Sequence, residues 1–380
     1  MSIVTPAAPV LAESPGGPRR PRRPPLDREQ RRSLLGMGGF VLLLHVVGWG
    51  TLLTLINPHH FALPGAQNSG KVFGIGIGLT AYVLGMRHAF DADHIAAIDN
   101  TTRKLMGEGK KPMSVGFWFS LGHSSVVFGM CAVIGFGVRA VAGQVTNGNS
   151  SLHSFAGVWG TLISGVFLLL IGWLNLVVLR QILGVFRRMR SGDFDESELE
   201  AHLDKRGVLN RVLGRVTRVV RKPWHMYPIG LLFGLGFDTV TEIGLFVIAG
   251  GAAAVALPWY AVLTLPVLFA AGMSLLDSID GVFMNFAYGW AMSRPVRKVY
   301  YNITITALSV AVALLIGFME IIGLVAQKLH ITRGPLAAIG NVDLQYVGYG
   351  IVGLFAVTWA IAFGVWKYGR IEEKWSARLR

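Results

Sequence analysis

Long apolar runs alternate with short polar connections along most of this chain. A run of about 18 residues is long enough for a helix to cross the hydrocarbon core of a bilayer. Eight runs reach that length when interrupting polar residues are tolerated, and they occupy residues 33–56, 71–98, 114–141, 155–180, 226–254, 258–290, 298–326 and 344–367. The pattern predicts an all-α integral membrane protein with eight transmembrane helices.

The connections between the runs differ in charge. Lys and Arg are concentrated in the two end segments and in alternate connections, whereas the intervening connections hold almost none. Because positively charged loops stay on the cytoplasmic side, this alternation predicts that both termini are cytoplasmic. The expected organisation is a disordered Arg/Pro-rich cytoplasmic tail at 1–32, transmembrane halves at 33–180 and 226–368, a charged cytoplasmic loop at 181–225 between them, and a cytoplasmic tail at 369–380.

The composition narrows the class of protein. Only 15% of the residues are charged and 52% are hydrophobic, against about 25% charged residues in soluble domains. A single cysteine excludes a disulfide framework and a thiolate metal site. The net charge of +14 is spread over short blocks between apolar runs, which indicates membrane topology and contact with a lipid bilayer, and no nucleic-acid partner. The oligomeric state stays open.

The two halves share a short motif. Phe90-Asp91 in the second run recurs as Phe237-Asp238 in the fifth run, and polar residues follow in both places. The expected topology gives these two runs opposite directions. Matching segments of opposite direction predict an inverted repeat, an architecture in which transporters bind substrate at the interface between repeats.

The second run contains a cluster of ionisable residues, Arg87, His88, Asp91, Asp93 and His94. A charged group at membrane depth costs about 2.5–3.5 kcal/mol on insertion scales, so such a cluster indicates function. On a continuous helix, His88, Asp91 and His94 share one face at i,i+3 spacing, while Asp93 points elsewhere and Arg87 borders the face, where it could balance the carboxylates. Imidazole with carboxylate suits Ni, Co, Zn, Cu or Fe. The alternative is a set of buried ion pairs that locks the helices together.

Further polar residues lie in other apolar runs. The third, fifth and sixth runs offer His123 with Ser120, Asp238 and Glu242 with Thr241, and Asp277 and Asp280 with Ser274. His45 in the first run and Asn175 in the fourth are weaker candidates, since each could be purely structural. Four carboxylates on two further helices favour convergence on a cation.

Four motifs together resemble the nickel/cobalt transporter family of bacterial secondary permeases. The family's H-x4-D-H core corresponds to His88, Asp93 and His94, and further motifs match at residues 119–127, 234–242 and 268–281. The resemblance covers nearly everything after residue 33 and implies a multi-pass permease of the bacterial inner membrane, with Ni2+ or Co2+ as imported substrate, no cofactor and no enzymatic activity. It also implies the metal-binding positions His88, Asp91, Asp93, His94, His123, Asp238, Glu242, Asp277 and Asp280.

Two other functions are weighed against import. Export of a divalent metal fits the same pattern of helices and charges. An intramembrane metalloenzyme would use similar donors, but the sequence contains no H-E-x-x-H, the spacing that sets two imidazoles beside a general base. The choice between nickel and cobalt, and the coupling ion, stay open at this stage.

Overall fold

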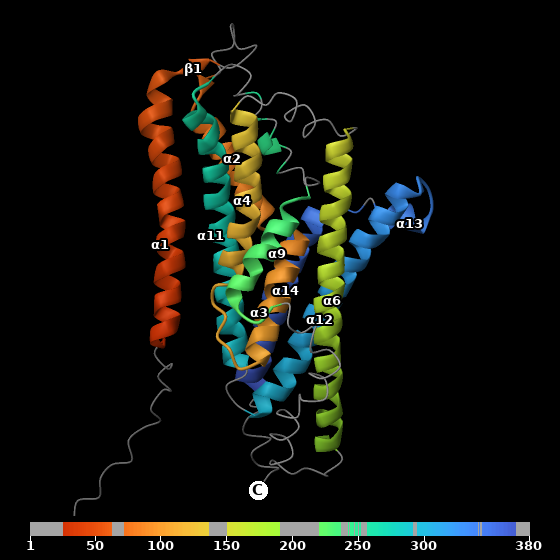
Figure 1. Ribbon diagram of the computed structural model, residues 1–380. Coiled ribbons are helices and arrows are strands. Elements are labelled where there is room, and N and C mark those ends of the chain that lie inside the picture. Colours follow the sequence, from red (N-terminus) through yellow and green to blue (C-terminus); the bar gives the residue numbers. More distant parts are fainter. Residues whose placement is uncertain are drawn as a thin grey trace, which may run out of the picture.

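The computed structural model describes residues 26–62, 72–136, 150–190, 220–236, 257–291, 295–340 and 344–369, together with 242, 244–246, 248–249, 251 and 342. Within these residues the protein is a bundle of helices, accompanied by one short antiparallel pairing of β1 (Phe61–Ala62) with β2 (Val72–Phe73) (Figure 1). The predicted helical fold class is confirmed at this level.

Five described helices are long and apolar enough to cross a membrane. They are α1 (Arg28–Thr51) with its continuation to His59, α4 (Val115–Gly135), α6 (Ser151–Arg190), α11 (Trp259–Ala291) and α12 (Pro295–Lys328). Each overlaps one of the predicted runs. Helix α1 begins earlier than the predicted tail boundary, because Asp27 and Gln30 form a capping box at its first turn. Helix α6 continues ten residues beyond the predicted end at 180.

Of the other three predicted runs, two contain interrupted helices, and the third is a helix whose apolar stretch, Tyr346–Thr358, is too short to count among these five. Run 71–98 holds two helices, α2 (Ile75–His88) and α3 (Ala92–Gly107). Run 226–254 begins with α9 (Met226–Phe233), and its described residues from Glu242 onward are helical. The eighth run is α14 (Leu344–Gly369). Eight membrane crossings therefore stay a prediction, and residues 1–25 and 370–380 lie outside the described part of the chain.

Short helical turns complete the described elements. They are the π-helix η1 (Leu52–Ile56), the 3-10 helices η2 (Asn57–His59) and η3 (Pro223–His225), and α13 (Pro335–Gly340). In Figure 1, α1 stands at one edge of the bundle, α2, α4 and α11 lie between α1 and α6, and α13 projects beyond α6. Helix α11 is the central element, since it packs against α1, α2, α3 and α4, while α12 packs against α6.

Close contacts at the two ends of each helix pair give the relative directions. Helices α2 and α3 run the same way as α11, α4 runs opposite to α11, and α9 runs the same way as α4. For α2 and α3 with α11, the contacting pairs are Gly85 with Phe269 and Gly289 with Met106. For α4 with α11, they are Gly116 with Asp277 and Gly135 with Val262. For α9 with α4, they are Gly230 with Phe119 and Gly234 with Val126. Helices α2 and α9, which open the second and fifth runs, therefore point in opposite directions.

Basic and polar residues gather where α3 ends and where α1, α4 and α9 begin; we call residues 26–28, 108–111 and 220–222 the basic end. Lys111 Nζ lies 2.8 Å from Asp27 Oδ2, and Lys110 Nζ donates a 2.6 Å hydrogen bond to the carbonyl of Arg221. The hydrogen bond from Lys111 holds the pKa of Asp27 below its ordinary value. Three segments that the charge pattern assigns to the cytoplasm thus meet at one end of the bundle.

Candidate metal site

The second run is interrupted at its ionisable cluster. Helix α2 ends at His88, where the amides of Phe90 and Asp91 donate 3.0 and 2.9 Å hydrogen bonds to the carbonyls of Arg87 and His88. Asp91 then adopts an extended conformation (φ −63°, ψ 140°) and α3 begins with the next residue. The prediction of one continuous helix through this cluster is therefore wrong. The Asp91 side chain makes no capping hydrogen bond to α3, so local capping does not account for the interruption.

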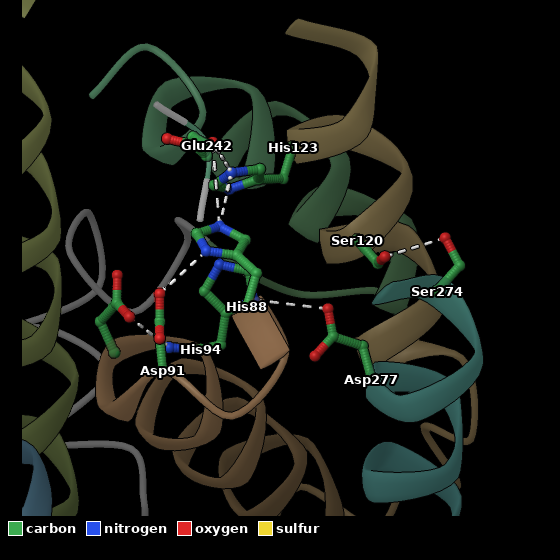
Figure 2. Close-up of polar contacts among 9 residues, drawn as sticks. His88, Asp91, His94, Ser120, His123, Glu242, Ser274 and Asp277 are labelled. Atoms are coloured by element: carbon green, nitrogen blue, oxygen red, sulfur yellow. Dashed lines mark hydrogen bonds and ion pairs between the residues drawn. The ribbon is translucent and has the colours of Figure 1, made fainter. Parts of the chain in front are cut away.

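Three histidines converge beside this interruption. His88 comes from the last turn of α2, His94 from the first turn of α3 and His123 from the middle of α4. All three side chains are buried, their ring centroids are 4.6 to 4.9 Å apart, and one ligand nitrogen from each lies within 4.8 Å of the others (Figure 2). Since these histidines come from separate helices, tertiary packing creates the cluster.

The spacing of the histidine nitrogens suits a transition metal. Nitrogen ligands of such ions sit about 2.1 Å from the metal, so adjacent ligands at a right angle are about 3.0 Å apart and opposite ones about 4.2 Å. The Nε2 atoms of His88 and His123 are 3.0 Å apart, the separation of two adjacent ligands. The third nitrogen, within 4.8 Å, requires a small inward movement.

Glu242 adds an oxygen to the same place. Its Oε1 atom lies 2.6 Å from His123 Nε2 and 3.8 Å from His88 Nε2, and the side chain is fully buried. These three atoms form a triangle whose edges fit around a single ion. A carboxylate oxygen beside imidazole nitrogens is a donor set that divalent nickel, cobalt and zinc all accept.

Two further carboxylates stand behind the imidazoles. Asp91 Oδ2 lies 2.8 Å from His88 Nδ1, and Asp277 Oδ2 lies 3.4 Å from His94 Nδ1. A carboxylate on one ring nitrogen fixes the tautomer and leaves the other nitrogen for a metal. His94 Nε2 has no hydrogen-bond partner among the described residues, as this arrangement requires. In this arrangement Asp91 and Asp277 are placed to orient histidines, and their role as direct ligands stays a prediction.

Tight helix packing holds the site. A Cβ atom on Gly85 would lie 2.0 Å from the carbonyl oxygen of Phe269, so α2 and α11 approach closely one turn before His88. Ser120 and Ser274, both predicted candidates, join α4 to α11 through a 2.9 Å hydrogen bond beside the histidines (Figure 2). The serines thereby hold α4 and α11 together beside the site, and neither forms a described hydrogen bond to His88 or His123.

Other predicted residues occupy less central positions. Asp93 Oδ1 accepts a 2.9 Å hydrogen bond from the His94 amide, so this carboxylate lies at the start of α3. Arg87 is partly buried in the last turn of α2, and Asp280 is partly buried one turn beyond Asp277. Asp238 and Thr241 lie outside the described residues.

The two weaker candidates have structural partners. His45 Nδ1 lies 2.8 Å from the carbonyl oxygen of Val41, and its Nε2 lies 3.2 Å from the Tyr82 hydroxyl. Asn175 donates a 2.8 Å hydrogen bond to Asn100 Oδ1, which ties α6 to α3. Each therefore has a role in packing that needs no metal.

Sequence reasoning missed a second buried charged group on α3. Asp99 is fully buried and Arg103 is 4% exposed, although the sequence placed neither among the candidates. Both residues lie beyond the predicted run 71–98, in a polar stretch, and their i,i+4 spacing, which lets an Asp and an Arg pair on a helix, was the available signal.

Comparisons with known proteins identify the family of this chain. Residues 74–365 match the NicO family, described as high-affinity nickel-transport protein. The chain is 60% identical to nickel transporter NicT of Mycobacterium tuberculosis over 90% of each chain, and 46% identical to nickel transporter NixA of Staphylococcus aureus over 92% of this chain and 98% of the relative. It is also 38% identical to cobalt transport protein NhlF of Rhodococcus rhodochrous, over 87% of this chain and 92% of the relative.

No solved structure matches the chain. The family match covers most of the described helices, and its members and the curated relatives carry the names of transporters rather than enzymes. Several helices able to cross a membrane accompany this match, which makes the protein a multi-pass membrane protein. The chain belongs to the NicO family of high-affinity nickel-transport proteins.

Proposed function

We propose that this protein is a secondary permease that imports Ni2+ across the bacterial inner membrane. The observation that carries the proposal is the buried cluster of His88, His94 and His123, with Glu242 2.6 Å from His123 Nε2. The ion, stripped of most of its water, binds these donors, while Asp91 and Asp277 orient two of the imidazoles. Asp93 and Asp238 stay candidates by their place in the family's motifs.

The distribution of buried charge favours a cationic substrate. Among the described residues, five acidic side chains are buried, those of Asp91, Asp99, Glu242, Asp277 and Glu320. The same part of the chain contains one buried side chain with a permanent positive charge, Arg103. Uncompensated charge in an apolar interior is strongly unfavourable, so protons or a bound cation must balance the remaining carboxyl groups.

The interrupted helices support a transporter architecture. Helix α2 stops at the motif Phe90-Asp91, and α9 stops at Phe233, just before the related motif at 237–238. Because α2 and α9 run in opposite directions, these paired interruptions fit an inverted repeat with substrate bound at its interface. With the basic end facing the cytoplasm, the N-terminal segment lies there, and eight crossings would bring the C-terminus to the same side.

Cobalt is the second candidate substrate. A relative with 38% identity carries the name cobalt transport protein, and three imidazoles with a carboxylate form a donor set that suits Co2+ as well as Ni2+, although such a set usually binds Ni2+ more tightly. We expect Co2+ to compete with Ni2+ for one site. Because neutral imidazole is the form that binds metal, binding displaces protons, and a proton gradient can drive turnover. Uptake that is unchanged when the gradient is collapsed would exclude this coupling.

Uptake of radioactive Ni2+ by cells that express the protein tests the proposal. His88→Ala and His123→Ala should each lower the initial uptake rate by about 100-fold or more, whereas the exposed His330→Asn should transport normally and serves as the matched control. Normal uptake by either site variant, at equal amounts in the membrane, would show that this is not the transport site. Inside-out vesicles that accumulate Ni2+ faster than cells take it up would instead indicate export.

A further inference from the structure

A second buried polar cluster lies farther along α3, between the histidines and the basic end. Arg103 donates hydrogen bonds of 2.7 Å to Thr306 Oγ1 and 2.8 Å to Ser309 Oγ, both on α12, and its guanidinium carbon lies 4.4 Å from the ring centroid of Tyr288 on α11. The Tyr288 hydroxyl donates to Asp99 Oδ1. This cluster joins α3, α11 and α12 and contains no residue of the histidine site.

Carboxyl groups lead from the histidine site to this cluster. Asp277 faces His94, Asp280 follows one turn later on α11, and Asp99 lies five residues beyond His94 on α3, which runs alongside α11 in the same direction. A Cβ atom on Gly281, the residue after Asp280, would lie 3.8 Å from Cγ2 of Ile98, the residue before Asp99, so Asp280 and Asp99 lie at neighbouring levels of α11 and α3. The order Asp277, Asp280, Asp99 thus follows α3 and α11 toward the basic end.

These carboxyl groups have unused acceptor atoms. Oδ1 of Asp277, Oδ2 of Asp280 and Oδ2 of Asp99 are buried and have no hydrogen-bond partner among the described residues. A buried acceptor without a partner costs about 1–3 kcal/mol, and more when charged. Purely structural carboxyl groups would be expected to satisfy both oxygens, so the unused oxygens indicate an intermittent cationic ligand.

Arg103 supplies the resident positive charge. It lies one helical turn after Asp99, and its charge acts on that carboxylate. A guanidinium has a fixed charge and a rigid fork of donors, which here is held by α12 and by the Tyr288 ring. In this position Arg103 places a fixed positive charge near Asp99, between α3, α11 and α12.

We propose that Asp99 and Asp280 form a second divalent-cation site, through which the metal passes between the histidine site and the cytoplasm, and that Arg103 keeps this site closed to the ion at rest. The direction in which the ion travels rests on the proposed function, whereas the existence of the second site is independent of it. When the ion arrives, it replaces Arg103 as the counter-charge of Asp99, and the guanidinium returns after release.

Counting bound Ni2+ on the purified full-length protein in detergent, by equilibrium dialysis and elemental analysis, tests the second site. Wild type should bind one ion per chain, because Arg103 occupies the second site. Arg103→Gln should bind two, Asp99→Asn combined with Arg103→Gln should bind one, and Arg103→Lys should stay at one because it keeps the charge. His88→Ala combined with Arg103→Gln should bind one ion at the second site.

One ion per chain in a folded Arg103→Gln protein would overturn the inference while leaving the histidine site intact. A wild-type protein that binds no Ni2+ would overturn the proposed function instead.

A second measurement avoids any variant that removes the guanidinium. Asp99→Asn should bind Ni2+ with an affinity within about two-fold of wild type, yet lower the uptake rate at least ten-fold. Tyr288→Phe removes the hydroxyl that donates to Asp99 but keeps both charges, and it should transport within about three-fold of wild type. Equal loss of uptake in the two variants would mean that Asp99 acts through packing alone, and uptake by Asp99→Asn at the wild-type rate would also refute the proposal.

Discussion

Replacing Gly85 by alanine should separate α2 from α11 and disrupt the metal site. The new Cβ would lie 2.0 Å from the carbonyl oxygen of Phe269, a backbone atom that no rotamer change can move away. Because real Cβ atoms essentially never come closer than 3.0 Å to such atoms, α2 must shift by about 1 Å, and His88 on the next turn shifts with it. Metal–ligand distances tolerate about 0.2 Å, and a misplacement of about 1 Å can reduce a rate about 100-fold.

The assay is the initial rate of Ni2+ uptake at equal membrane abundance, together with the melting temperature of the purified protein. Gly85→Ala should lower uptake by about 100-fold and destabilise the protein by about 1–3 kcal/mol, the usual range for overpacking. Gly76→Ala lies on the same helix with nothing within 4 Å of its new Cβ, so it should leave uptake within about two-fold of wild type. If Gly85→Ala transports as well as this control, close approach of α2 and α11 does not set the geometry of the site.

Three further variants test other contacts. Asp277→Asn should weaken Ni2+ affinity by about 10–100-fold without abolishing binding, as expected for a carboxylate that orients an imidazole; an unchanged dissociation constant by isothermal titration would argue against that role. Ser120→Ala and Ser274→Ala should be non-additive in a double-mutant cycle of thermal stability, with a coupling of about 0.5–1.5 kcal/mol for their shared hydrogen bond, and simple additivity would show that the bond contributes nothing. Asp27→Asn should lower the melting temperature equally at pH 5 and pH 8. A carboxyl group whose folded pKa is depressed stabilises the folded protein above its ordinary pKa of 3.8 and loses that contribution as the pH falls through the lowered value. A difference in melting temperature between variant and wild type that grows below pH 4 would contradict the role of Lys111.

The sequence predicted the helical class and most helix positions because apolar length and charge alternation are local properties. Helices α11 and α12 begin and end within three residues of the predicted runs at 258–290 and 298–326. The interruption between α2 and α3 was missed, since His-Ala-Phe-Asp-Ala-Asp is compatible with a helix and only tertiary packing decides where the chain turns. Helix periodicity could not reveal it.

The membership of the metal site was only partly predictable for the same reason. Motifs identified His88, His94 and His123, but their mutual distances depend on how α2, α3 and α4 cross. The proposed distinction between a ligand carboxylate and an orienting one also rests on distances, because Asp91 and Glu242 look equivalent in a sequence. The residues around Asp99 lie between 288 and 309 on other helices, so the local sequence does not predict them.

The last helix of the chain, α14, packs against the interruption between α2 and α3. A Cβ on Gly348 of α14 would lie 1.8 Å from the carbonyl oxygen of Phe90, so α14 covers the exposed peptide groups there. All three histidines precede this helix in order of synthesis. A nascent chain released before residue 344 would contain every imidazole and lack the cover, and nickel handling should therefore begin only after the ribosome has delivered the C-terminal helix to the membrane.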